Sequence, residues 1–91
     1  MNCTKHIQIF GRVQGVFFRE SMCIKAQELG LTGWVRNRQD GSLEAMAQGV
    51  ETQINALIEW ARRGPEKAYV QSMAISDGYG DYADFKRIDT I

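Results

Sequence analysis

The stretch Gly11-Arg12-Val13-Gln14-Gly15-Val16-Phe17-Phe18-Arg19 joins two elements of different hydrophobic period. It follows Ile7-Gln8-Ile9-Phe10, which is typical of a strand, and it leads into a helical pattern from Phe18. The glycines allow successive backbone N–H groups to turn inward together without a Cβ clash. Such groups beside a helix N-terminus bind anions, and Arg19 adds a permanent planar cation. We therefore predict a phosphate-sized anion loop here; the alternative is a tight turn whose arginine faces water.

Strand and helix patterns alternate along the rest of the chain. Apolar residues at helical spacing predict one helix over 18–29, ended by Gly30, and a second over 51–63, ended by Gly64-Pro65. The first helix buries the stripe Phe18, Met22, Ala26 and Leu29, and the second buries Ile54, Leu57, Ile58 and Ala61. Period-two alternation predicts strands over 4–10, 32–38, 42–48, 67–76 and 82–88. Two amphipathic helices both need a sheet face, so we predict an α+β fold, a ferredoxin-like split βαβ sandwich with an antiparallel or mixed sheet and both helices on one face.

Length and charge narrow the class of protein. The 91 residues predict one domain over 1–91, and the 11 basic residues balance the 11 acidic ones. A balanced charge disfavours a nucleic-acid binder, and no apolar run is long enough to cross a membrane. The start of the chain lacks the apolar segment of a signal peptide. We therefore expect a cytoplasmic protein with neither nucleic acid nor membrane as a partner.

The cysteines indicate no disulfide framework and no metal site. Cys3 and Cys23 form no CxxC pair, and His6 is the one histidine that could join them. We expect both to be reduced thiols, and we expect His6 to be structural or solvated rather than catalytic.

A second polar candidate lies where the second predicted strand ends, in Gly33-Trp34-Val35-Arg36-Asn37. Alternation puts Val35 and Asn37 on one face of the sheet. An amide can donate and accept hydrogen bonds, which suits a residue that orients an attacking water. The alternative is an asparagine favoured at a strand end because it forms turns.

Together the two segments resemble the two signatures of the acylphosphatase family. The first is Gly11 to Val16 followed by Phe18-Arg19, and the second is Gly33 to Asn37 followed by Asp40-Gly41 and Glu44. Gly64-Pro65, with Ala68 and Val70 after it, is similar to the family's entry into its fourth strand. The likeness covers nearly the whole chain, in order and at the right spacing.

This resemblance implies a ferredoxin-like sandwich that hydrolyses the carboxyl–phosphate bond of acyl phosphates, which are small-molecule substrates. It implies that Arg19 binds the phosphate and that Asn37 orients the water. The backbone cradle corresponds to Arg12, Val13, Gln14, Gly15 and Val16. The family is also monomeric, cytosolic and free of cofactors, so we expect no metal and no organic cofactor.

Two positions depart from the family pattern. Arg38 follows Asn37 where many members have a small or uncharged residue, which predicts a more basic rim to the site. In Phe85-Lys86-Arg87-Ile88, members more often place an apolar residue two after the phenylalanine, so the register of the last strand stays open.

Other readings of the same residues remain. For Arg12, Arg36 and Arg38 we favour a solvated charged face over steering of an anionic substrate. For Phe17, Phe18 and Trp34 we favour core packing over a platform for stacking bases.

The alternative function is a non-catalytic anion- or RNA-binding module on the same fold. Another is a detached relative of the acylphosphatase-like domain of larger carbamoyl-transferring maturation proteins. The presence of both Arg19 and Asn37 favours the enzyme, the balanced charge disfavours RNA, and the length disfavours the detached domain.

Overall fold

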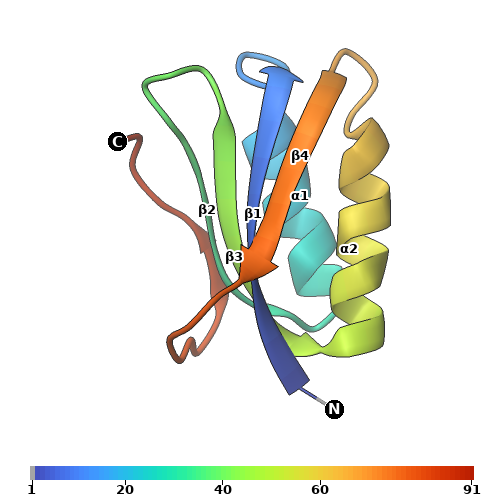
Figure 1. The fold of residues 1–91 in the computed structure, drawn as a ribbon, viewed down its shortest axis with the longest axis vertical. Helices are drawn as coiled ribbons and strands as arrows, with labels where there is room; N and C mark the ends of the chain where they lie inside the picture. Colours follow the sequence, from blue (N-terminus) through green and yellow to red (C-terminus); the bar gives the residue numbers. More distant parts are fainter. Residues whose placement is uncertain (1) are drawn as a thin grey trace.

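A five-stranded sheet with both helices on one face makes up the fold (Figure 1). The computed structural model describes residues 2–91. In chain order its elements are β1 (Asn2–Arg12), α1 (Phe18–Glu28), β2 (Thr32–Asn37), β3 (Leu43–Val50), α2 (Glu51–Arg63), β4 (Tyr69–Asp77) and β5 (Phe85–Arg87). The strands lie in the order β4-β1-β3-β2-β5, and all neighbours are antiparallel except β2 and β5. The predicted ferredoxin-like α+β fold with a mixed sheet is confirmed.

The core lies between the sheet and the two helices. Strand alternation turns Ile7, Ile9, Val35, Leu43, Ala45 and Ala47 toward the helices, and all six are fully buried. The helical stripes meet them with Phe18, Met22 and Ala26 from α1 and with Ile54, Leu57 and Ala61 from α2. Leu29 lies at the edge of this core. Each large apolar side chain contributes about 1.5–3 kcal/mol by its burial, so the core fixes which strand face looks toward the helices.

Two aromatic residues that we expected in the core lie outside it. Phe18 is buried, but Phe17 is 79% exposed because it precedes α1 and has a left-handed backbone, with φ 63°. Trp34 lies on the uncovered face of the sheet because it alternates with buried Val35. Its ring centroid is 4.8 Å from the guanidinium carbon of Arg36. The expectation of core packing is therefore correct for Phe18 and wrong for Phe17 and Trp34.

The last strand is shorter than its sequence pattern predicts. We expected residues 82–88, whereas β5 spans Phe85–Arg87. It runs parallel to β2, with Phe85 opposite Gly33 and Arg87 opposite Val35. The chain leaves β4 at one edge of the sheet and reaches β2 at the other, so the residues before Phe85 are used in the crossing. This pairing gives the register that the sequence left open and puts Arg87 on the same face as buried Phe85.

Neither cysteine takes part in a disulfide. Cys3 is partly buried and Cys23 is buried, and both are free thiols. Burial raises the pKa of the Cys23 thiol, which keeps it protonated at neutral pH. No helix within residues 2–91 is long and apolar enough to span a membrane.

Thermal stability should therefore be independent of reductant. We expect melting curves recorded by circular dichroism with and without dithiothreitol to superimpose, because no cross-link constrains the unfolded chain. A lower Tm in dithiothreitol, together with a mass gain on reduction, would show that the thiols are bridged.

Candidate active site

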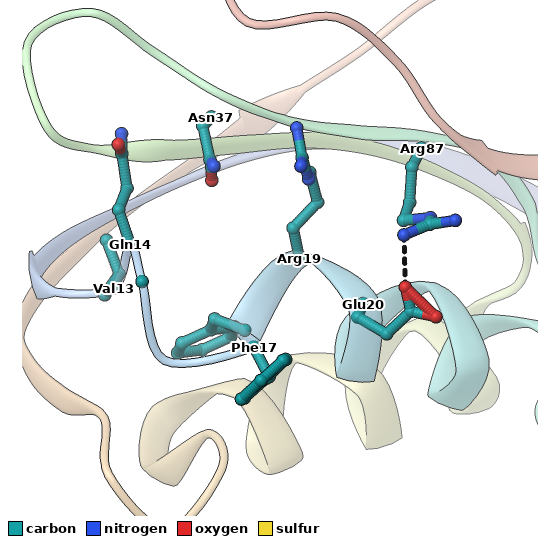
Figure 2. Close-up of a pocket in the computed structure, with 9 residues that line it drawn as sticks. Val13, Gln14, Phe17, Arg19, Glu20, Asn37 and Arg87 are labelled. Atoms are coloured by element: carbon teal, nitrogen blue, oxygen red, sulfur yellow. Dashed lines mark hydrogen bonds and ion pairs between the residues drawn. The ribbon is translucent and has the colours of Figure 1, made fainter.

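The loop between β1 and α1 borders a pocket of about 410 Å³ (Figure 2). Four parts of the chain line it: the loop, the first turn of α1, the end of β2 and the end of β5. The lining residues are Val13, Gln14, Gly15, Phe17, Phe18, Arg19, Glu20, Asn37 and Arg87. Five of the predicted site residues therefore meet here, namely Val13, Gln14, Gly15, Arg19 and Asn37.

Arg12 and Val16 are the predicted site residues that do not line this pocket. Arg12 is exposed at the end of β1 and borders a separate hollow with Asp40 and Tyr69. Val16 is partly buried and packs against the core. Val13, Gln14 and Gly15 thus line the pocket together, and Val16 is the loop residue that turns to the core instead.

The backbone of the loop is shaped by left-handed residues. Gly15 has φ 72°, a conformation that costs glycine little, and Phe17 has φ 63°, which is uncommon for a bulky residue. Phe17 is the N-cap residue that precedes α1, and its side chain makes no capping hydrogen bond. In residues 2–91, the backbone hydrogen bonds outside the helices and strands include none donated by the N–H groups of residues 14–17. These donors are the kind of group that an anion satisfies at a helix N-terminus.

Arg19 lies in the first turn of α1, and its guanidinium extends toward the strand that carries Asn37 (Figure 2). The side chain is in none of the ion pairs or side-chain hydrogen bonds found within residues 2–91, which link other partners. A guanidinium is always charged and can donate two parallel hydrogen bonds. Within residues 2–91, Arg19 is thus a cation without an ion-pair partner, and it lines the same pocket as the loop.

Asn37 is the last residue of β2 and points into the pocket between Gln14 and Arg19 (Figure 2). It shares a face with buried Val35, as alternation predicts. Its Oδ1 is buried and accepts no hydrogen bond from any described residue. Leaving such an acceptor unpaired costs about 1–3 kcal/mol. An atom held in this way is suited to accept a hydrogen bond from a water molecule or a substrate.

Known proteins of one family are similar to this chain along nearly its whole length. The family model described as Acylphosphatase matches residues 5–87. The chain belongs to the acylphosphatase family. A relative named acylphosphatase from Thiobacillus denitrificans is 51% identical over 92% of this chain and 94% of its own. Another from Albidiferax ferrireducens is 53% identical over 91% of this chain and 90% of its own. The solved structure of an acylphosphatase from Coxiella burnetii is 42% identical and covers 96% of this chain and 93% of its own, with a TM-score of 0.92.

Membership of this family makes the chain an enzyme that hydrolyses the carboxyl–phosphate bond of acyl phosphates, releasing a carboxylate and inorganic phosphate. The fold that carries this activity is the one described above, because the match extends from β1 to β5.

The side chain of Gln14 connects the loop to the strand end that carries Asn37. Its Nε2 donates hydrogen bonds to the carbonyl oxygens of Arg38 at 2.7 Å and of Ser42 at 2.9 Å. These carbonyls belong to the turn between β2 and β3. The sequence identified Gln14 for its backbone amide alone, and gave no sign that its side chain fixes the distance between the two halves of the pocket.

Arg38 does not line the pocket, so the expectation of a more basic rim is wrong. The reason is strand alternation, because Arg36 and Arg38 lie on the sheet face opposite Asn37. There Arg36 Nε and Arg38 Nη1 donate to Glu44 Oε1 at 2.8 and 3.0 Å. His6 Nε2 lies 2.6 Å from Glu44 Oε2, so His6 also belongs to this cluster and not to the pocket.

Glu44 is 8% exposed, and burial raises its pKa. The hydrogen bonds from His6, Arg36 and Arg38 lower it further than burial raises it, and the pKa falls to about 2. The carboxylate therefore stays charged and keeps its partners throughout the neutral range.

Glu20 and Arg87 line the pocket but were not among the predicted site residues. They form an ion pair beside Arg19, with each side chain about half exposed. The sequence did carry a signal for Arg87, which stands where family members more often have an apolar residue. Because Arg87 alternates with buried Phe85, its side chain lies on the sheet face that looks toward the helices. Glu20 gave no such signal.

Proposed function

We propose that Arg19 and the backbone amides of residues 12–16 hold the phosphoryl group of an acyl phosphate while Asn37 orients the attacking water. One observation carries the proposal: within residues 2–91 the Arg19 guanidinium has no ion-pair partner and the buried Asn37 Oδ1 accepts no hydrogen bond, and both line one pocket. Beside them the amides of residues 14–16 donate none of the backbone hydrogen bonds found outside the helices and strands of that range. The family to which the chain belongs supports the chemistry, and the pocket supports the division of roles.

The reaction needs little from the protein beyond positioning and charge. The oxygen of water attacks phosphorus, the bond from phosphorus to the acyl oxygen breaks, and its electron pair leaves with the carboxylate. Arg19 and the loop amides stabilise the charge that develops on the phosphoryl oxygens, and they do so without moving. Asn37 Oδ1 accepts a hydrogen bond from the water and holds it in line with the leaving group. A phosphoryl oxygen of the substrate takes the proton, because Glu20, the carboxylate that lines the pocket, is already paired with Arg87.

We further infer one domain over 1–91, a monomer in the cytoplasm, whose partner is the small-molecule substrate and not nucleic acid or a membrane. The single domain is supported by coverage of 94% and 90% of two relatives. The balanced charge supports the absence of a nucleic-acid partner. Light scattering after size exclusion tests the monomer, which has a mass of 10.3 kDa.

Purified protein should hydrolyse benzoyl phosphate at full rate in EDTA. The leaving carboxylate needs no protonation, and no group of three or more His, Cys, Asp or Glu side chains within residues 2–91 is arranged to hold a metal. A phosphate monoester such as p-nitrophenyl phosphate should be hydrolysed at least about 100-fold more slowly, because no acid is placed to protonate its leaving oxygen. Activity that is lost in EDTA and restored by magnesium, or comparable turnover of the two substrates, would contradict the mechanism.

A further inference from the structure

The end of β2 is held from the sheet face opposite the pocket. Arg36 and Arg38, the neighbours of Asn37 on either side, both donate to one oxygen of Glu44, at 2.8 and 3.0 Å. The other oxygen of Glu44 contacts His6 on β1 at 2.6 Å. Glu44 itself lies on β3 directly opposite Arg36. One buried carboxylate thus fixes both residues that flank Asn37.

We infer that Glu44 is a positioning residue for Asn37, acting through the side chains of Arg36 and Arg38. The inference rests on the proposed role of Asn37 as the residue that orients water. Glu44 never faces the pocket, so it influences the reaction only by fixing where the Asn37 amide lies.

Alternation makes this indirect contact effective. Because Arg36 and Arg38 point away from the helices, tying both of them to one point limits rotation of the backbone between them. That rotation would swing the Asn37 side chain within the pocket. From the pocket side, Gln14 holds the carbonyl of Arg38 at 2.7 Å. The strand end is therefore clamped on both faces, by Gln14 on one and by Glu44 on the other.

Two other roles for this cluster predict different results. If Glu44 only stabilised the sheet, its loss would lower the Tm and leave the kcat of the folded protein unchanged. If Arg38 only attracted the substrate by its charge, its loss would lower kcat/KM in a salt-dependent way and leave kcat unchanged. Positioning predicts a loss of kcat with normal binding of phosphate, because the water and not the phosphate is misplaced.

The test compares Glu44→Gln and Arg38→Met with the wild-type protein and with Lys5→Met. Lys5→Met removes a different ion pair, the one between Lys5 and Asp77, and serves as the matched control. Arg38→Met is the variant better able to fold. The Arg38 side chain is 35% exposed, and its loss keeps the buried contacts of Glu44 with Arg36 and His6. Measurements are kcat with benzoyl phosphate, Ki for inorganic phosphate, and the side-chain amide NMR signal of Asn37.

We expect both variants to lose about 10- to 100-fold in kcat, the cost of misplacing a reacting group by around an ångström. The Ki for phosphate should stay within about twofold, as should every kinetic constant of Lys5→Met. The Asn37 amide signal should shift in both variants and not in the control. Arg38→Lys, which keeps one donor, should recover part of the kcat.

A folded Arg38→Met protein with unchanged kcat, or one whose Ki rises as much as its kcat falls, would overturn the inference. If Glu44→Gln does not fold, Arg38→Met alone decides. Wild-type protein with no acylphosphatase activity would instead refute the proposed function, and the Asn37 signal would still report whether Glu44 fixes that side chain.

Discussion

Arg19→Ala is expected to lose turnover of benzoyl phosphate and, together with it, inhibition by inorganic phosphate. In the proposed site Arg19 supplies a cation that has no ion-pair partner within residues 2–91, and the phosphoryl group carries its charge in both the ground state and the transition state. Loss of an arginine that stabilises phosphoryl transfer costs on the order of a thousandfold in kcat. That factor corresponds to about 4 kcal/mol of transition-state stabilisation. Steady-state kinetics and calorimetric titration with phosphate measure the two losses.

Arg63→Ala is the matched control for this prediction. Arg63 is an exposed arginine at the end of α2, outside the pocket, so the variant removes the same charge and should behave as wild type. Arg19→Lys should recover charge but not the planar pair of donors, and we expect it to bind phosphate better than the alanine variant while remaining slow. Arg19→Ala protein that still binds phosphate normally would mean that the loop amides alone form the anion site.

The fold was predictable because its main signals are local and repeated. The stripe from Phe18 to Ala26 and the pair Ile7 and Ile9 each mark a buried face by spacing alone, and the structure buries them all. The failure at Phe17 depended on where a helix begins. Phe17 and Phe18 are indistinguishable as residue types, and only the start of α1 at Phe18 puts one in the core and the other outside it.

Part of the pocket was predictable because its signals, like those of the fold, lie in short stretches of sequence. Gly15, Arg19 and Asn37 belong to the two short segments that resemble the acylphosphatase signatures. The fold brings both segments to one pocket. Arg38 was misplaced because adjacency to Asn37 in sequence means opposite faces in a strand. Arg87 lies 68 residues beyond Arg19 in the chain, and only the parallel pairing of β5 with β2 brings it to the pocket.

Asn37→Ala is expected to lose catalysis but keep phosphate binding. Its Oδ1 is buried and accepts no hydrogen bond from any of residues 2–91, and in the proposed reaction it receives the hydrogen bond of the attacking water. Removing one such oriented group costs about 100- to 1000-fold in kcat. In the proposed site the phosphate still meets Arg19 and the loop amides, so its Kd should stay within about threefold of the wild-type value. Calorimetry with phosphate and steady-state kinetics on the folded variant separate these two quantities.

The contrast between the two variants tests the division of roles more sharply than either does alone. Asn55→Ala, an exposed asparagine on α2, controls for the chemical change and should be neutral in every measurement. If Asn37→Ala binds phosphate as poorly as Arg19→Ala, Asn37 is a phosphate ligand and its assignment to the water is wrong. If Asn37→Ala keeps near-normal turnover, the residue only ends β2, and the buried Oδ1 has no part in the reaction. Low kcat with intact phosphate binding is the one result that requires an oriented water, because every other interaction with the phosphoryl group remains in place.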